Sequence, residues 1–128
     1  MPASGHALRH AGVHFDAVRI AGVFAEDVAY RLMAYTDFRA GPVVRELAGG
    51  RNMYFLLPPG TAAGYRWPPG ETRVLTRTSG CAAYVGVPAF DGLTWPLDWR
   101  SRPTDDVPFV DPELLHLHVT EARAAEGR

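Results

Sequence analysis

Met53-Tyr54-Phe55-Leu56-Leu57 is the most apolar run in the chain, and Pro58-Pro59-Gly60 follows it directly. The shortness of the run and its aromatic content favour a strand over a helix, and the proline–glycine sequence ends it. We therefore predict a central strand at residues 53–57.

The segments before this run predict a hairpin and an earlier strand. Residues 42–47 (PVVREL) form a modest strand pattern, and residues 49–52 (GGRN) read as a turn that joins this strand to the central one. Residues 17–20 (AVRI) alternate and are β-branched at two positions, which indicates a short first strand.

A helix is expected between the first strand and the hairpin. Phe24, Val28, Leu32 and Tyr35 recur at helical spacing and form one apolar stripe. We expect Glu26 and Asp27 in the first turn, where acidic groups suit the helix dipole, and Asp27 is placed to pair with Arg31. Gly41-Pro42 is expected to stop the helix.

Two further strands and a second helix are expected after the central run. Residues 73–76 and 82–87 have strand composition, whereas residues 60–71 and 88–112 read as long loops. Asp111-Pro112-Glu113 predicts a helix start, with Asp as N-cap and Pro at the first helical position. The buried stripe of this helix is expected to comprise Leu114, Leu115, His118, Val119 and Ala122.

The order β-α-β-β-β-β-α predicts an α+β fold of two layers: a mainly antiparallel sheet of about five strands with two helices. We expect a single domain over residues 15–122. Residues 1–14 are expected to be a flexible segment and residues 123–128 a frayed tail.

Composition restricts the classes of function. The chain has 128 residues and a net charge of −1, which argues against strong non-specific binding to nucleic acid. All 13 basic residues are arginine, which fits a GC-rich genome. The lone cysteine, Cys81, excludes an intramolecular disulfide framework. With no signal-peptide pattern and no long apolar stretch, we expect a cytoplasmic protein that does not enter a membrane.

Several short segments together resemble a family of short actinobacterial proteins, which are often described as related to the N-terminal region of bifunctional DNA primase/polymerases. The resemblance covers about residues 10–118. It is carried by residues 14–19 (HFDAVR), 41–44 (GPVV), 54–62 (YFLLPPGTA), 67–68 (WP), 84–88 (YVGVP) and 95–97 (WPL).

This resemblance implies a strand with two acids, one residue apart, that bind divalent metals, and a histidine near the nucleotide phosphates. Here Asp16 is followed two residues later by Val18. The pairs Glu26-Asp27 and Asp105-Asp106 are adjacent, so on a strand they would face opposite sides. We therefore expect a copy without catalytic residues.

The sequence offers weak candidates for a metal site, a nucleophile and a phosphate-binding loop. His6, His10 and His14 would line one face of a helix and could bind a metal, but glycines weaken a helix there. Cys81 lacks the pattern of an activated nucleophile, and no phosphate-binding glycine motif occurs. We predict no metal and no cofactor.

Aromatic and arginine residues are interleaved in or beside the two long loops. They are Tyr65, Trp67, Tyr84, Trp95 and Trp99, together with Arg66, Arg73, Arg100 and Arg102. Such residues form stacking and cation–π platforms for bases, planar ligands or partner proteins. They also pack long loops onto a sheet, which is the interpretation we favour for the aromatics, and both hold if the cluster rims a pocket.

The leading hypothesis is a non-catalytic binding or regulatory module that uses the loop face made by residues 60–72 and 88–105. Its ligand would be a partner protein, a second copy, a nucleotide or single-stranded nucleic acid. The expected contact residues are Tyr65, Arg66, Trp67, Arg73, Trp95, Trp99 and Arg100.

Two alternatives stay open. A reduced enzyme of the primase/polymerase type would line its site with His14, Asp16 and Arg73. A structural homodimer would form through an exposed edge strand or the tryptophan loops.

Overall fold

The computed structural model describes residues 6–10, 15–49, 51–68, 72–75, 84–88 and 97–126, with the backbone alone at 6–10 and 84–88. The described elements are β1 (His6–His10), β2 (Asp16–Ile20), α1 (Gly22–Tyr35), β3 (Val43–Glu46), β4 (Met53–Leu57), the short 3-10 helix η1 (Ala62–Gly64), β5 (Thr72–Leu75), β6 (Tyr84–Pro88), β7 (Leu97–Ser101) and α2 (Pro112–Glu126).

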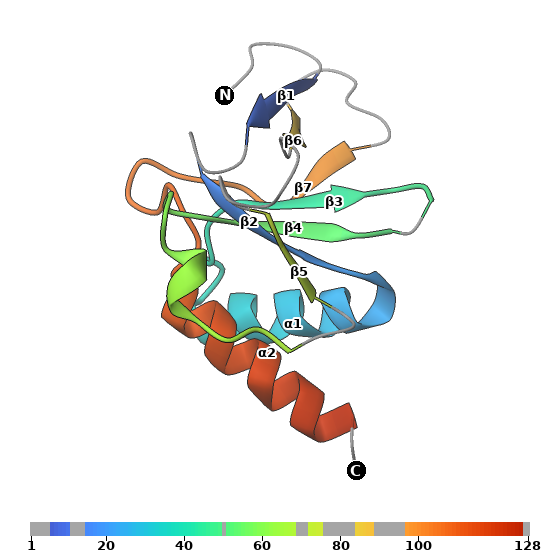
Figure 1. Ribbon diagram of the computed structural model, residues 1–128, viewed down its shortest axis with the longest axis vertical. Helices are drawn as coiled ribbons and strands as arrows, with labels where there is room; N and C mark the ends of the chain where they lie inside the picture. Colours follow the sequence, from blue (N-terminus) through green and yellow to red (C-terminus); the bar gives the residue numbers. More distant parts are fainter. Residues whose placement is uncertain are drawn as a thin grey trace.

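The main sheet has five strands in the order β5-β2-β4-β3-β7, and every neighbouring pair is antiparallel. The predicted central strand is confirmed, because β4 lies in the middle of this sheet (Figure 1). The hairpin between β3 and β4 is confirmed too, with Val44 opposite Tyr54. The α+β class and the predicted order of elements are therefore correct.

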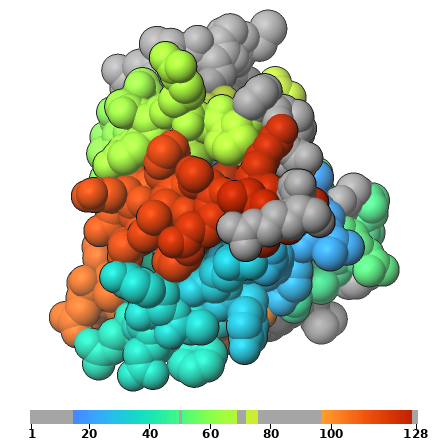
Figure 2. Space-filling view, turned by 90° about the horizontal axis from the view of Figure 1, so that it is seen from below, coloured from blue at the N-terminus to red at the C-terminus, as the bar shows by residue number. Residues whose placement is uncertain are grey.

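Both helices cover one face of the sheet and lie side by side (Figures 1 and 2). The larger core forms between them and the sheet. It includes Val18, Phe55 and Leu57 from the strands, Leu32 from α1 and Leu115 from α2, all at most 1% exposed. A second cluster, which contains Ala17, Val44 and Leu56, lies on the other face of the sheet.

Two strands of the structure lie in segments for which the sequence predicted none. β1 falls within the segment expected to be flexible and pairs with β6 in a separate two-stranded sheet. β7 falls within the predicted loop at 88–112 and pairs with β3. Both pairings join segments far apart in sequence, which local periodicity does not report. The fifth strand of the main sheet is thus β7 and not β6.

α1 differs from the prediction at both ends. It begins at Gly22, with no side-chain cap and no acidic residue in its first turn, so Glu26 and Asp27 lie in the second turn. It ends at Tyr35, before Gly41-Pro42, and the backbone N–H of Thr36 donates to the Leu32 carbonyl at 3.0 Å. The predicted pair is confirmed: Arg31 Nε donates to Asp27 Oδ1 at 3.0 Å.

α2 begins as predicted. Asp111 Oδ1 accepts hydrogen bonds from the backbone N–H groups of Glu113, at 2.9 Å, and Leu114, at 3.3 Å. The expected stripe faces the core, with Leu115, His118, Val119 and Ala122 buried and Leu114 half-buried. The helix continues past Ala122 to Glu126.

Candidate functional site

Two of the predicted contact residues, Tyr65 and Trp67, pack on α2 and not into an open platform. Their ring centroids lie 5.8 Å apart, and each also contacts His116, at 5.5 Å from Tyr65 and 5.3 Å from Trp67. Trp67 Nε1 donates to the Ala62 carbonyl at 2.9 Å. His116 Nε2 lies 2.8 Å from the Arg66 carbonyl oxygen. These contacts attach the loop after η1 to α2, which is the packing role that the aromatic residues suggested.

Arg100 lies away from that loop, on the helix side of the sheet. Its Nη2 lies 2.7 Å from Glu26 Oε1, and its Nη1 lies 3.2 Å from Met33 Sδ, both groups of α1. A neighbouring ion pair joins Arg45 of β3 to Asp98 of β7 through two hydrogen bonds of 2.9 and 2.6 Å. The carboxylate of Asp98 raises the pKa of Arg45. Arg100 therefore links β7 to α1 and is not part of the loop face.

Arg73 and Trp99 lie on the sheet face opposite the helices, in one transverse row. In the register, Arg73 is opposite Arg19, Arg19 is opposite Tyr54, Tyr54 is opposite Val44, and Val44 is opposite Trp99. Directly paired residues point to the same face of a sheet. The row therefore has two of the predicted contact residues at its ends, and three residues that were not predicted as contacts, Arg19, Tyr54 and Val44, lie between them.

We call three neighbouring residues at the β5 end of this row the arginine row: Arg73, Arg19 and Tyr54. Arg73 is exposed, and Arg19 and Tyr54 are half-buried. Tyr54 Oη donates to Glu46 Oε1 at 3.2 Å. Burial raises the pKa of Tyr54, and Glu46 raises it further, whereas the Arg19 guanidinium lowers it. The hydroxyl of Tyr54 thus lies in the field of both Arg19 and Glu46.

Arg19 and Arg73 are like charges directly opposite each other on adjacent strands. Side chains in such positions have Cβ atoms about 4.5–5.5 Å apart, and like charges there destabilise the strand pair. Within the described residues, no carboxylate forms an ion pair with either guanidinium. The arginine row therefore has an excess of positive charge.

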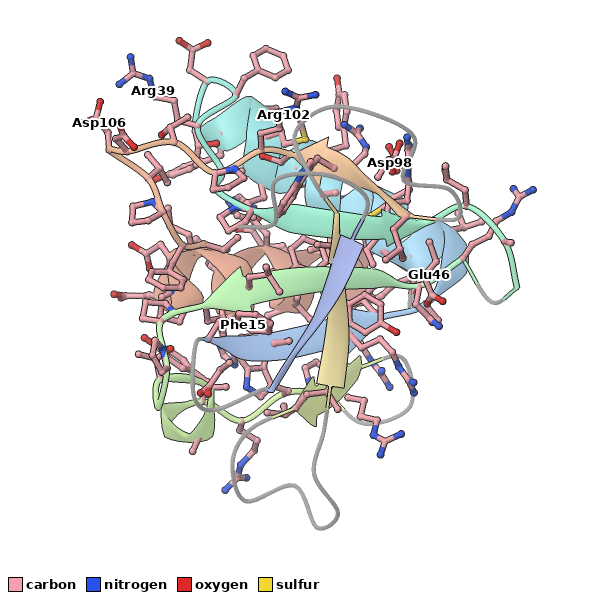
Figure 3. All side chains as sticks on the ribbon, turned by 90° about the horizontal axis from the view of Figure 1, so that it is seen from above. Phe15, Arg39, Glu46, Asp98, Arg102 and Asp106 are labelled. Carbon is pink, nitrogen blue, oxygen red and sulfur yellow. The ribbon has the colours of Figure 1, made fainter. Side chains whose placement is uncertain are left out.

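The two-stranded sheet of β1 and β6 crosses the same face of the main sheet (Figures 1 and 3). In Figure 3, Phe15 and Glu46 lie on opposite sides of the crossing strands. Val44 and Leu56 are fully buried or nearly so, at 0% and 1% exposed, whereas Arg73 at the β5 edge is exposed. Within the row, Arg73 is therefore exposed, Arg19, Tyr54 and Trp99 are half-buried, and Val44 is buried.

Asp16 lies on the other face of the sheet from Arg73. Alternation along β2 places Asp16 on the face of Val18, which is opposite Val74, the neighbour of Arg73 in β5. Asp16 is 1% exposed, and its Oδ2 accepts the backbone N–H of Ala62 at 2.9 Å. Its Oδ1 has no hydrogen-bond partner in the described part of the chain. The carboxylate of Asp16 thus holds the start of η1.

The remaining predicted residues form no common centre. His6 and His10 belong to β1, a strand and not the helix on which a metal site would have depended. His14, Cys81 and Trp95 lie outside the described residues. Among the residues that are described, no group of three or more histidine, cysteine or acidic residues could hold a metal ion.

No family model, curated protein or solved structure matches this chain. In the part that the structure describes, neither helix has the length and apolar character needed to cross a membrane. The sequence predicts only part of the candidate site: it indicates Arg73 and Trp99 as contact residues, whereas it indicates Arg19 and Tyr54 only as strand residues. The strand alternation at 17–20 was the signal that could have placed Arg19 on the face opposite Val18.

Proposed function

We propose that this protein is a non-catalytic binding module that takes a nucleotide-like ligand at the arginine row, with a phosphate group between Arg19 and Arg73. The observation that carries this proposal is the register, which sets Arg19 and the exposed Arg73 directly opposite each other on one face of the sheet. A guanidinium offers a planar fork of donors that matches the oxygens of a phosphate. A bound phosphate would remove the repulsion between the two arginines.

Tyr54 supports the same ligand. Its hydroxyl is held by Glu46 and lies beside Arg19, so the Arg19 side chain has a polar neighbour that restricts its position. A restricted guanidinium loses less conformational freedom when a ligand binds. The half-buried ring of Tyr54 and the flat guanidinium groups provide surfaces against which a base stacks.

A purely structural role for Arg73 is the main alternative. β5 is an edge strand of the main sheet, and charged side chains on edge strands prevent edge-to-edge aggregation. This role would not require Arg19, which lies on the adjacent inner strand. It would also predict that Arg73 has no effect on the binding of phosphate.

The reduced-enzyme hypothesis has less support. It requires Asp16 and Arg73 to line one site, and the two residues face opposite sides of the sheet. The resemblance to the primase/polymerase-related family fits a nucleotide-like ligand without requiring catalysis. We also propose a cytoplasmic location, because the lone Cys81 cannot form an intramolecular disulfide.

The test is a titration of the full chain with inorganic phosphate, AMP, ADP and a fluorescent oligothymidylate, followed by calorimetry and by fluorescence polarisation. We expect binding of the phosphate-bearing probes that weakens as salt is added. Arg19→Met and Arg73→Met should each raise the dissociation constant about tenfold or more, because each removes charge-assisted hydrogen bonds.

Arg66→Met is the matched control, since Arg66 is an exposed arginine on the loop that packs against α2. It should leave the dissociation constant unchanged. Loss of binding in Arg66→Met alone would move the site to the loop face. The proposal fails if no probe binds, or if Arg73→Met aggregates while the ligand affinity of its soluble fraction is unchanged.

A further inference from the structure

A pocket of about 430 Å³ opens between the end of α1 and the start of α2, and we call it the helix-end pocket. Three segments line it: the end of α1 with the turn after it, Pro58 after β4, and residues 106–112 with Leu114. All of these residues belong to the described part of the chain. Pockets that bind small molecules have volumes of about 300–1,000 Å³. The helix-end pocket is therefore large enough for a small ligand.

The inner wall of the helix-end pocket is apolar. Leu32, Ala40 and Val110 line it and are at most 3% exposed, and the half-buried Leu114 lies with them in the lining. The Thr36 hydroxyl also belongs to the lining, but it donates to the Leu32 carbonyl at 2.8 Å. An apolar group of a ligand would therefore contact apolar side chains here.

Two opposite charges lie in the lining on different segments. Arg39 belongs to the turn after α1 and Asp106 to the segment before α2, and both are exposed. Figure 3 shows the two residues at the same corner of the molecule. Within the described residues, neither side chain forms an ion pair, with the other or with a third group. The rim of the pocket therefore offers one cation and one anion to a ligand.

The backbone around the pocket is held in place without a ligand. The N–H of Val110 donates to the Leu56 carbonyl at 2.8 Å, which attaches the segment before α2 to the sheet. Gly41, with a φ of +95°, lets this segment come so close that an added Cβ would lie 2.7 Å from the Phe109 oxygen. A site that exists before binding loses less conformational freedom when the ligand binds.

The turn that carries Arg39 has an unfavourable backbone. Asp37 and Phe38 have φ angles of 54° and 64°, in the left-handed region that residues other than glycine rarely adopt. Phe38 is 75% exposed, so burial of its ring does not explain this conformation. Strained residues of this kind concentrate at ligand sites, where the strain positions a neighbouring group. Here the neighbouring group is Arg39, whose N–H donates to the Thr36 carbonyl at 3.2 Å.

We propose that the helix-end pocket binds a free α-amino acid with an apolar side chain. Such a molecule carries its carboxylate and its ammonium on one carbon, so the two charges are close together and match a guanidinium and a carboxylate at one rim. The Arg39 guanidinium donates to the ligand carboxylate in a bidentate pair, and the Asp106 carboxylate accepts from the ammonium. The apolar side chain contacts Leu32, Val110 and Leu114.

The charges of the pocket favour this class over simpler amphipathic molecules. Asp111, which caps α2 through Oδ1, adds a second carboxylate to the lining. An apolar carboxylate would meet both acidic residues, and an apolar amine would leave the Arg39 guanidinium unpaired. The start of α2 offers no other site for an anion, because the N–H groups of Glu113 and Leu114 already donate to Asp111. A ligand with both charges pairs with the guanidinium and with a carboxylate.

The helix-end pocket is separate from the arginine row. None of its lining residues belongs to that row, and Leu32 and Leu114 pack into the core on the opposite face of the sheet from Arg19 and Arg73. The two proposals can therefore fail separately.

The test is a titration of the full chain with L-leucine and L-phenylalanine, followed by calorimetry and by backbone amide shifts in nuclear magnetic resonance spectra. We expect saturable binding, with shifts at Ala40, Val110 and Leu114. Phenylpropionate lacks the ammonium, phenethylamine lacks the carboxylate and glycine lacks the apolar side chain. Each of these three compounds should bind about tenfold or more weakly than L-phenylalanine.

Arg39→Met and Asp106→Asn should each raise the dissociation constant of L-phenylalanine about tenfold or more. Both residues are exposed, so the variants should keep the thermal midpoint of the wild type. The matched controls are Arg51→Met and Asp105→Asn, which change exposed residues outside the pocket lining and should keep the wild-type affinity.

Three results would overturn the proposal. In the first, neither amino acid binds, or the amide shifts lie away from the helix-end pocket. In the second, Arg39→Met and Asp106→Asn bind L-phenylalanine as tightly as the wild type does. In the third, phenylpropionate or phenethylamine binds as tightly as L-phenylalanine, which would mean that only one of the two charges is recognised.

Discussion

His118 is a buried histidine, 5% exposed, whose two ring nitrogens make no hydrogen bond with the described residues. Its ring lies edge-on to Tyr35, with centroids 5.1 Å apart, and its Nδ1 lies 3.7 Å from Glu121 Oε2. Burial lowers the pKa of His118; Glu121 acts in the opposite direction, and Arg31 lowers it further. The folded protein therefore favours the neutral imidazole between α1 and α2.

We expect the free energy of unfolding to fall as the pH drops below the ordinary histidine pKa of 6.5. The unfolded chain takes up a proton there while the folded chain resists it, so the stability present above this pH is progressively lost toward the lower folded pKa. Urea unfolding at pH 7.5 and pH 5.5 measures the difference. His118→Leu should show a smaller loss, and an identical loss in both proteins would contradict this account.

Gly41 has a φ of +95°, and a Cβ placed on it would lie 2.7 Å from the backbone oxygen of Phe109. Gly41→Ala should therefore lower the free energy of unfolding by more than about 2 kcal/mol, because both the backbone and the neighbouring loop must shift. Gly22→Ala is a matched control, since φ is +58° and no atom lies within 4 Å of the added carbon. It should cost about 1–2 kcal/mol. Equal effects in chemical denaturation would argue against the contact with Phe109.

At the scale of elements, α2 depends on its first turn. Asp111→Ala removes the acceptor for the N–H groups of Glu113 and Leu114 and should destabilise the protein by about 1 kcal/mol. Asp111→Asn keeps a side-chain oxygen and should cost little. Guanidinium unfolding of both variants checks this prediction, which is refuted if the two variants behave alike.

The start of α2 and the strand at 53–57 were predictable because their signals are local: a capping residue, a proline at the first helical position, and a short apolar run between turns. The ends of α1 were not. Gly22 enters the helix with a φ of +58°, and Thr36 closes it through the Leu32 carbonyl, so the apparent stop at Gly41-Pro42 lies beyond the true end. Gly41 does not end α1. Its lack of a side chain allows the backbone of residues 109–110 to pack closely against it.

At the scale of the whole molecule, one core joins the sheet to both helices. Phe55 lies at its centre in β4 and is 0% exposed. Phe55→Ala should lose about 3–5 kcal/mol. Because a domain of this size has a stability of about 5–15 kcal/mol, the thermal midpoint should fall markedly in a single transition. Leu117→Ala, on the exposed side of α2, should stay within about 0.5 kcal/mol of the wild type.

The alternation along each strand, the start of α2 and the apolar runs that become buried can be predicted from the amino-acid sequence, because they depend on neighbours within a few positions. Which strands lie side by side depends instead on contacts between segments far apart in the chain. Strand pairing placed Arg73 beside Arg19, turned Arg100 toward Glu26 and separated Tyr65 and Trp67 from both. A shift of register by one residue would move Arg19 to the other face, and the energy that prevents this shift comes from core contacts between distant segments.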